Sequence, residues 1–397
     1  MNENVMKNIL KNEATPLYVF DIDRLKKRVQ FLRSSLPQNI DLCYAIKANP
    51  FLSLILSHEL PYLEICSPGE LKICQRLNIP HSQYVISGIS KDEEDIASLM
   101  EDSHPVAFYT AESLFQFMFL RNTARRFNKK VKVLLRLTSG SQFGIDQKEL
   151  TKLVKNYCHD PWIEIEGLRY FSGTQKNSIK KLTREINFLD DFLEELYTKY
   201  HCKMPRLEYG PGFPVSYFEG EDFDEEAFLK NFSDLLTKMR YDGSITLEIG
   251  RSLAASCGTY LTRVVDKKQN NGENYAIVDG GMHHIVYYGH FMAMKHPHFS
   301  IMPSRPDSKE KLWNICGSLC TANDFLVKEI PIKGLCLGDV LTFENAGAYC
   351  MTEGLSLFLS RDLPEVILLH EDGSYTVVRN SLPINELNTP HGDLTGF

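Results

Sequence analysis

Lys47 is the residue in this chain best suited to covalent chemistry. It lies in the run YAIKANP, residues 44–50, within an apolar, strand-like segment that ends at a turn over Asn49 and Pro50. Burying a charged ammonium is costly unless it is paired or neutralised, and burial favours the neutral amine that forms a Schiff base. The pattern therefore indicates a chemical role. The alternative is an edge strand whose lysine extends to water.

Charged side chains also stand at the ends of other predicted strands. Glu64 ends one strand, and Arg136 and Arg169 lie near the ends of two more. Glu248 and Arg251 follow a fourth, in the run LEIGR. Glu248 and Arg251 can simply pair with each other. They are also what a pyridoxal phosphate site requires, which is a carboxylate for the pyridine nitrogen and a cation near the phosphate.

Glycines follow two of these strands. Gly210 and Gly212 belong to the run GPGF, and Gly250 precedes the arginine of LEIGR. Glycine lets backbone N–H groups approach an anion closely. A GxG sequence is most often a plain turn, but its position directly after a predicted strand favours an anion site.

The second half of the chain carries a possible proton donor. Cys320 and Asp324 lie in the run CGSLCTAND, residues 316–324, which is rich in small and polar residues. A lone cysteine is usually an inert core thiol, but this pair could supply a proton and an anchor for an amino group. Tyr349 follows a glycine-bearing turn and could reach a phosphate.

His283 and His284 stand side by side after the run VDGGM. Adjacent residues on an extended segment point to opposite faces, so the two histidines are poor joint ligands for a metal. We therefore predict no metal site.

The elements that position these residues alternate regularly from about residue 25 to residue 265. Short apolar runs alternate with amphipathic helical segments, which predicts either a (β/α)₈ barrel or an open doubly wound sheet. The predicted strands cover residues 41–48, 62–65, 84–87, 106–109, 131–137, 163–170, 206–209 and 245–249.

After about residue 260, β-like runs separated by Gly, Asn and Asp predict a mostly β domain. An isolated strand at residues 17–20 could pair with it, and residues 270–272 (NNG) predict a hairpin turn. We therefore predict three segments. Residues 1–25 contain a strand that joins the β domain, residues 26–262 form the barrel, and residues 263–397 form the β domain.

Composition excludes several classes of protein. The net charge of −7 over 397 residues leaves no basic footprint for nucleic acid. No apolar run approaches the roughly 18 residues that span a bilayer, and the N-terminus lacks the apolar core of a signal peptide. The ten scattered cysteines favour reduced, buried thiols in a cytoplasmic protein.

The motifs together resemble the fold-type III pyridoxal-phosphate decarboxylases, the group of diaminopimelate, ornithine and arginine decarboxylases. Within it, the chain is most similar to the branch that decarboxylates a glutamyl group on an acyl-carrier protein in the butirosin pathway. The matching runs, in family order, are YAIKANP, EICSPGEL, SQFGI, FSGTQ, GPGFP, LEIGRSL, VDGGM, CTAND and GAY.

This resemblance implies an alanine-racemase-like (β/α)₈ TIM barrel plus a C-terminal β domain, with pyridoxal 5′-phosphate as cofactor. Lys47 would hold the cofactor as a Schiff base, Glu248 would pair with the pyridine nitrogen, and Glu64 and Arg136 would lie near both. The phosphate would be held by Ser172, Gly210, Gly212, Gly250, Arg251 and Tyr349.

The resemblance also implies a homodimer with active sites at the interface. Cys320 would reach in from the other subunit and protonate the carbanion left after CO₂ departs. Asp324 would contact the distal polar group of the substrate. His283 and Tyr288 stand where the diaminopimelate enzymes carry substrate-binding residues, so they too are expected to contact substrate.

Several positions depart from the family pattern. Arg169 takes the place expected for the histidine that stacks on the cofactor ring, and Pro211 replaces the middle glycine of the phosphate loop. Thr321 replaces a glutamate that binds the far amino group of diaminopimelate. A basic or amide-bearing amino acid, or one tethered to a carrier protein, therefore fits better than diaminopimelate.

Two other functions are compatible with the same residues. Racemisation or epimerisation would use the same cofactor with an acid or base on the opposite face. A catalytically silent homologue would act as a regulator, an alternative that the intact Lys47, Glu248 and Arg251 argue against.

Overall fold

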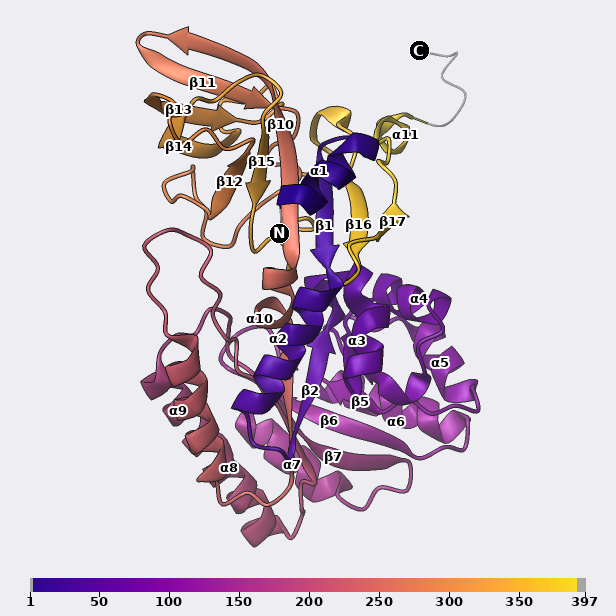
Figure 1. Ribbon diagram of the computed structural model, residues 1–397. Helices are drawn as coiled ribbons and strands as arrows, with labels where there is room; N and C mark the ends of the chain where they lie inside the picture. The colour runs from indigo at the N-terminus through magenta and orange to yellow at the C-terminus, as the bar shows by residue number, and fades with distance from the viewer. Residues whose placement is uncertain (1–2, 391–397) are drawn as a thin grey trace. The chain divides into compact units, whose positions relative to one another are not determined.

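The computed structural model describes residues 3–390, which form two compact units (Figure 1). The barrel unit comprises residues 28–215 and 223–253, and the β unit comprises the described residues up to 27, residues 216–222 and those from 254 on. The sequence placed the boundary after residue 262. Residues 1–2 and 391–397, at the ends of the predicted outer segments, lie outside the described residues. Within residues 3–390, no helix is both long and apolar enough to cross a membrane.

Eight parallel strands close into a barrel, so the predicted barrel is confirmed over the open sheet. Closure comes from β2, which pairs with both β3 and β9. The strands are nearly continuous apolar runs, as expected where both faces are covered. They are β2 (Ile40–Ala45), β3 (Tyr62–Ile65), β4 (Tyr84–Ile86), β5 (Phe108–Ala111), β6 (Val131–Leu137), β7 (Ile163–Phe171), β8 (Arg206–Gly210) and β9 (Ser244–Ile249).

Helices alternate with these strands. Several begin at a side chain that accepts a hydrogen bond from a first-turn backbone N–H, for example Ser67 before α4 and Ser113 before α6. The helices are α2 (Ile22–Ser35), α3 (Ser53–Glu59), α4 (Pro68–Arg76), α5 (Glu93–Glu101), α6 (Leu114–Arg126), α7 (Gln147–Tyr157), α8 (Ile179–Tyr200), α9 (Glu225–Thr237) and α10 (Arg251–Ala254).

Lys47 does not lie within a strand. β2 ends at Ala45, and the lysine occupies a single 3₁₀ turn, Ile46–Ala48. The next turn begins at Asn49, whose side chain accepts a hydrogen bond from the backbone N–H of Phe51. The lysine therefore stands on the loop at the C-terminal end of a barrel strand, the usual position for catalytic residues in this fold.

The β unit is a mixed sheet in the order β14-β13-β11-β10-β1-β16-β17, with β15 pairing with β10 and β12. It also contains α1 (Glu3–Asn12) and α11 (Asn385–Asn388). The strands are β1 (Leu17–Asp21), β10 (Gly258–Asn270), β11 (Glu273–Val278), β12 (Phe299–Met302), β13 (Glu310–Cys316), β14 (Phe325–Lys333), β15 (Val340–Phe343), β16 (Glu365–Leu369) and β17 (Tyr375–Arg379).

Two local predictions in this unit are confirmed. The N-terminal strand β1 joins the sheet, antiparallel to β10 and parallel to β16. The hairpin turn also forms, with Asn271 and Gly272 both at positive φ (49° and 87°), as a type I′ turn requires. The β-like runs predicted after about residue 260 did not include β12 or β14. Pro331 interrupts the pattern of β14, which is tolerated because β14 is the edge strand.

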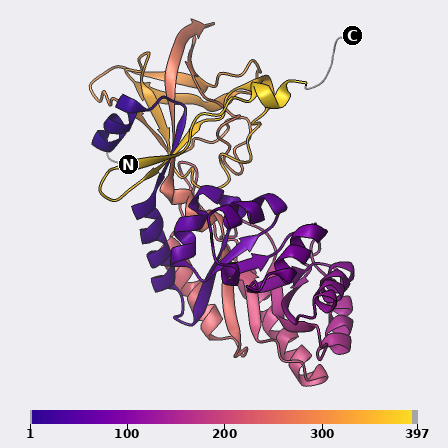
Figure 2. The same ribbon diagram turned by 90° about the vertical axis from the view of Figure 1, so that its right-hand side faces the viewer.

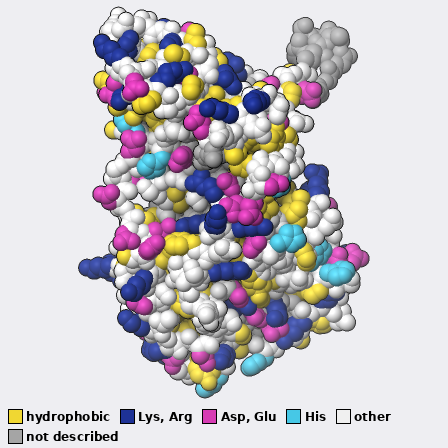
Figure 3. Space-filling model, in the orientation of Figure 1, with side chains coloured by type: hydrophobic (Ala, Val, Ile, Leu, Met, Phe, Trp, Pro, Cys, Tyr) yellow, Lys and Arg dark blue, Asp and Glu magenta, His cyan; other side chains and the backbone are white. Residues whose placement is uncertain are grey.

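The core of the β unit brings together elements from the first and the last part of the described chain. Met6 and Ile9 of α1 pack with Val19, Leu261 and Ile367. Figure 2 shows α1 and the C-terminal hairpin β16–β17 in the same unit. On the face drawn in Figure 3, basic and acidic side chains are interspersed, in agreement with the weak net charge.

One pair of cysteines departs from the prediction. Cys158 and Cys202 form a disulfide across 44 residues, with their Cα atoms 6.1 Å apart. Both lie just after a helix, α7 or α8, rather than in an apolar strand. The prediction of reduced thiols is therefore wrong for this pair, and the other eight cysteines are free.

Candidate active site

Lys47 lies between two carboxylates at the C-terminal end of the barrel. Its Nζ is 2.5 Å from Glu64 Oε2 and 3.3 Å from Glu248 Oε1, and the Cys66 sulfur lies at 3.5 Å. Neighbouring parallel strands β3, β2 and β9 supply or precede these residues, so their side chains meet at one rim. The lysine side chain is 39% exposed, whereas both glutamates are buried. The structure thus brings together three residues that the sequence predicted for one site.

Arg169 closes this group from within the barrel. Its Nη2 pairs with Glu64 Oε1 and lies 2.6 Å from Glu248 Oε2, and its Nη1 donates to Ser87 Oγ. Each glutamate therefore uses one oxygen for Lys47 and the other for Arg169. The four charged side chains form a closed ring in which cations and carboxylates alternate.

The charges within this ring determine the pKa of its members. Burial opposes the charge of Glu64, but Arg169 and Lys47 outweigh it and hold the pKa of that carboxyl well below its usual range. Burial likewise opposes the charge of Arg169, yet Glu248, Glu64 and Glu208 raise its pKa. Glu64 and Arg169 are therefore both charged at neutral pH.

The position of Arg169 does not suit the predicted stacking on a cofactor ring. Its guanidinium is 2% exposed and is engaged by carboxylates. Phe171 lies two residues further toward the rim on the same face of β7. It is half-buried and pairs in register with Gly210, where an added Cβ would lie 2.5 Å from the phenyl ring. Phe171 is therefore the side chain of β7 better placed to meet a flat ligand.

Arg136 takes part in a separate pair. Its Nη1 lies 2.9 Å from Glu112 Oε2, and its guanidinium lies 4.6 Å from the centre of the Phe143 ring. Both contacts are on the β5–β6 side of the barrel.

Ser172, predicted to bind phosphate, is engaged elsewhere. Its hydroxyl donates to Glu185 Oε1 (2.6 Å) and accepts from Lys176 Nζ (2.9 Å). Glu185 also contacts Lys176 Nζ (2.7 Å) and accepts from the Tyr209 hydroxyl (2.7 Å). Burial opposes ionisation of Glu185, but these hydrogen bonds lower its pKa. Ser172 therefore belongs to a network that joins β7, β8 and α8.

Thr174 contacts Arg251, the cation that the sequence predicted for the phosphate. Its hydroxyl accepts a hydrogen bond from Arg251 Nε at 3.2 Å. Gly212, at φ 60°, lies so close that an added Cβ would be 2.0 Å from the Gly173 carbonyl. This crowding requires glycine there, and it places the Gly210–Gly212 turn beside Thr174. Gly173, between Ser172 and Thr174, has a φ of 131°, in the region that favours glycine.

Gly250 links β9 to the turn that carries Arg251, and its carbonyl accepts a hydrogen bond from the backbone N–H of Leu253 (3.3 Å). The predicted phosphate residues Gly210, Gly212, Gly250 and Arg251 therefore lie at the ends of β8 and β9 or just after them. Ser172 is linked to the same region through Lys176, whose backbone N–H donates to the Gly212 carbonyl (2.9 Å).

In the β unit, Asp324 has a structural task. Its two carboxylate oxygens accept hydrogen bonds from the backbone N–H groups of Met282 and Leu319, each at 2.8 Å. The residue is 3% exposed, and an added Cβ on Gly317 would lie 2.2 Å from the carboxylate. The predicted contact with substrate does not fit this geometry. Asp324 instead holds the loop that presents Cys320, which is exposed.

The two histidines do not lie on an extended segment. Residues 281–285 form a turn, in which the backbone N–H groups of His284 and Ile285 donate to the Gly281 carbonyl. The rings of His283 and His284 lie 3.7 Å apart. Burial, with His284 and Arg361 nearby, lowers the pKa of His283 to about 3.

His283 is only 1% exposed, so the predicted substrate contact is not supported. Tyr288, five residues further along, is 47% exposed and remains accessible. Tyr349 is half-buried at positive φ (64°), in the turn that follows β15.

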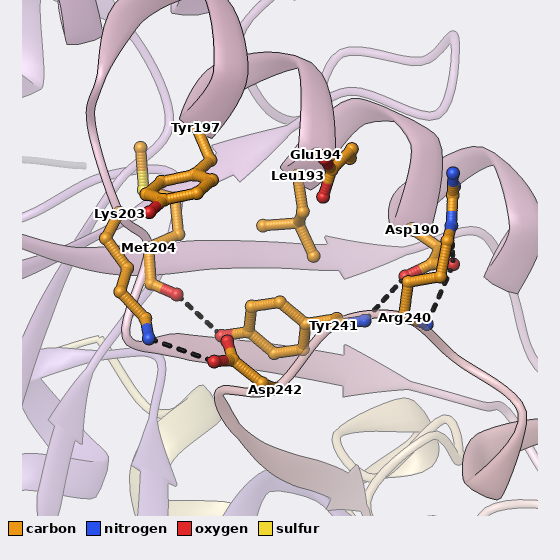
Figure 4. Close-up of a pocket in the computed structure, with 9 residues that line it drawn as sticks. All are labelled: Asp190, Leu193, Glu194, Tyr197, Lys203, Met204, Arg240, Tyr241 and Asp242. Carbon is orange, nitrogen blue, oxygen red and sulfur yellow. Dashed lines mark hydrogen bonds and ion pairs between the residues drawn. The ribbon is translucent and has the colours of Figure 1, made fainter.

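A separate pocket opens at the other end of the barrel, next to the N-terminal ends of β8 and β9 (Figure 4). Four of the charged residues that line it form two ion pairs. Arg240 Nε lies 3.0 Å from Asp190, and Lys203 Nζ lies 3.2 Å from Asp242. It is far along the strands from Lys47, and we assign it no part in the site.

Comparisons with known proteins show the family to which the chain belongs. Residues 17–347 match the family model described as pyridoxal-dependent decarboxylase, C-terminal sheet domain. The chain belongs to the pyridoxal-dependent decarboxylase family. The decarboxylase is 27% identical to the L-glutamyl-[BtrI acyl-carrier protein] decarboxylase of Niallia circulans, over 94% of this chain and 92% of that protein. It is 25% identical to the diaminopimelate decarboxylase of Aquifex aeolicus, over 94% and 91%.

The fold is also that of a solved relative. The crystal structure of diaminopimelate decarboxylase from Helicobacter pylori complexed with L-lysine aligns with a TM-score of 0.84 at 22% identity, over 96% of this chain and 98% of that one.

The residues present in the decarboxylase fit its cofactor, pyridoxal 5′-phosphate. Lys47 offers a partly exposed amine, and Glu248 is a buried carboxylate within reach of it. Thr174, Arg251 and the tightly packed Gly212 would offer a phosphate a hydroxyl, a cation and closely approaching backbone.

Proposed function

We propose that this decarboxylase removes CO₂ from the α-carbon of an L-amino acid or of an aminoacyl group tethered to a carrier protein. The observation that carries the proposal is Lys47, held between Glu64 and Glu248 at the rim of the barrel. Family membership favours decarboxylation over the racemase alternative.

Each residue has a task that follows from its position. Lys47 is the attachment point for the cofactor, and Glu248 is the carboxylate suited to the pyridine nitrogen. Thr174 and Arg251 are suited to the phosphate. When bound, pyridoxal phosphate supplies a conjugated ring that delocalises the electron pair left by departing CO₂.

Cys320 is proposed to return a proton to the α-carbon. Its thiol is exposed on the loop that Asp324 fastens, so it can reach a neighbouring molecule. We propose that the enzyme is a homodimer in which this loop completes the site of the partner subunit, and that it works in the cytoplasm.

The substrate proposal rests on two observations. The Niallia circulans relative acts on a glutamyl group carried by an acyl-carrier protein. Thr321 follows Cys320, and its neutral side chain gives a second ammonium group no counter-charge. A carrier-tethered or amide-bearing substrate is therefore favoured over diaminopimelate.

The test is a CO₂-release assay on the cofactor-loaded enzyme. It would include free lysine, ornithine, arginine, glutamate and diaminopimelate, glutamyl thioesters of an acyl-carrier protein, and Lys47→Ala as the blank. Release from the thioester that is lost in Lys47→Ala supports the proposal. Release from diaminopimelate alone would overturn the substrate class, and spectral binding of substrates with no CO₂ release would overturn the reaction.

A further inference from the structure

A third buried glutamate lies beside the charged ring that holds Lys47. Glu208 on β8 is the direct neighbour of Arg169 on β7, and its Oε1 lies 3.1 Å from Arg169 Nε. The N–H is not aligned with that oxygen. Neither oxygen of Glu208 accepts a hydrogen bond from any residue that the structure describes, although the side chain is only 1% exposed.

The charges of the ring are already balanced without Glu208. Lys47 and Arg169 are two cations, and Glu64 and Glu248 are two carboxylates that each contact both cations. The other cation that faces Glu208, Arg206, is paired with Asp41 at 3.5 Å. An ionised Glu208 would therefore add a net negative charge in the barrel interior, where an unsatisfied charge is costly.

The surroundings of Glu208 also favour its neutral form. Burial, together with Glu248 and Glu64, raises its pKa to about 7 against the opposing effect of Arg169. The titratable and charged groups that face it are Arg169, Glu248, Glu64, Arg206 and Cys43.

We propose that Arg169 is a positioning residue that orients Glu64 and Glu248 toward Lys47, and that Glu208 is the protonated, neutral carboxyl that keeps this buried cluster in charge balance. The link to catalysis rests on the proposed role of Lys47. Removing the charge of Lys47 leaves the cluster with one cation fewer, so it makes Glu208 harder to ionise.

The first measurement needs no cofactor. Infrared spectra of the cofactor-free protein are recorded across pH 5 to 9 for the wild type, Glu208→Gln and Lys47→Met. We expect a protonated-carboxyl band that is absent in Glu208→Gln, disappears as pH rises through about 7 in the wild type, and persists to higher pH in Lys47→Met.

Glu185→Gln is the matched control, because Glu185 is also buried but its pKa is lowered, so this variant keeps the band. A wild-type spectrum without the band at pH 5 to 6, or a band unchanged in Glu208→Gln, would overturn the role of Glu208. Both results are independent of whether Lys47 binds the cofactor.

The role of Arg169 is tested by the visible absorption of bound pyridoxal phosphate, titrated with pH. We expect Arg169→Met to shift the pH at which the absorption changes and to weaken cofactor affinity about tenfold or more, with Arg169→Lys restoring part of both. If Arg169→Met fails to fold, the titration of Arg169→Lys alone tests the positioning role of Arg169. An unshifted titration in the folded variants would overturn the positioning role, whereas loss of absorption only in Lys47→Ala would leave the proposed function intact.

Discussion

At the scale of single residues, the site depends on which cation each carboxylate oxygen contacts. Glu64 and Glu248 each bind Lys47 with one oxygen and Arg169 with the other. Charge-assisted hydrogen bonds of this kind restrict rotation of the carboxylate. The lysine amine is therefore held in a fixed direction before any ligand arrives.

The two hydroxyls near the glycine turn allow a direct comparison. Thr174→Val keeps the shape of the side chain but removes the acceptor that Arg251 uses. We expect cofactor affinity to fall about tenfold, the effect of roughly 1.4 kcal/mol. Equilibrium titration of the cofactor-free enzyme with pyridoxal phosphate measures it.

Ser172→Ala is the matched variant. It removes a partner of Glu185 and Lys176, so we expect a loss of about 1–2 kcal/mol in the free energy of unfolding and little change in cofactor affinity. The reverse pattern, with affinity lost in Ser172→Ala and kept in Thr174→Val, would restore the phosphate role that the sequence gave to Ser172.

The pH dependence of stability reports on Glu208. Its pKa rises from 4.5 to about 7 on folding, so between these values the folded protein holds a proton that the unfolded chain has released. This contribution to stability is complete below about pH 4.5 and is lost as pH rises through 7, a change of about 3 kcal/mol.

Urea unfolding at pH 5 and pH 8, for the wild type and Glu208→Gln, measures this contribution. We expect the stability of the variant relative to the wild type to increase with pH, because glutamine cannot ionise. A difference that stays constant between the two pH values would show that Glu208 has the same charge in both states.

At the scale of elements, Asp324 joins two loops that are distant in sequence. Its carboxylate binds the backbone beside Met282 and the backbone of Leu319, next to Cys320. The glycines at 281 and 317 leave room for it, since an added Cβ on either would lie within 3 Å of the carboxylate.

Asp324→Asn therefore tests whether this carboxylate holds the two loops together. The amide nitrogen would face a backbone N–H group, so one buried donor loses its acceptor, at a cost of about 1–3 kcal/mol. We expect a lower free energy of unfolding and faster hydrogen exchange in residues 317–324. Asp307→Asn, on an exposed loop, is the control. Normal exchange in Asp324→Asn together with a raised KM would instead support direct contact with substrate.

At the scale of the whole molecule, the proposed dimer predicts complementation. In a purified heterodimer of Lys47→Ala and Cys320→Ala subunits, one site would have both residues intact if Cys320 comes from the partner. We expect about half of the wild-type activity, although each parental homodimer is nearly inactive. An inactive heterodimer would show that Lys47 and Cys320 act within one chain.

The sequence by itself predicted the alternation of strands and helices, the β unit and the residues that meet around Lys47, whereas closure of the strands into a barrel was shown by the structure. Alternating apolar runs and helical segments are local patterns that can be read from the sequence. Neighbouring parallel strands point the same way, so their C-terminal ends lie at the same edge of the sheet. Lys47, Glu64 and Glu248 could therefore be placed together because each stands at or just beyond the end of a strand.

Only the tertiary structure decided where the side chains of turns and interior positions point. The hydroxyl of Ser172 contacts Glu185 and Lys176 while that of Thr174 contacts Arg251, and a turn rather than a strand holds His283. Arg169 found its partners on three other strands, β3, β8 and β9. Such contacts depend on backbone direction and on charges distant in sequence, which no local pattern of residues specifies.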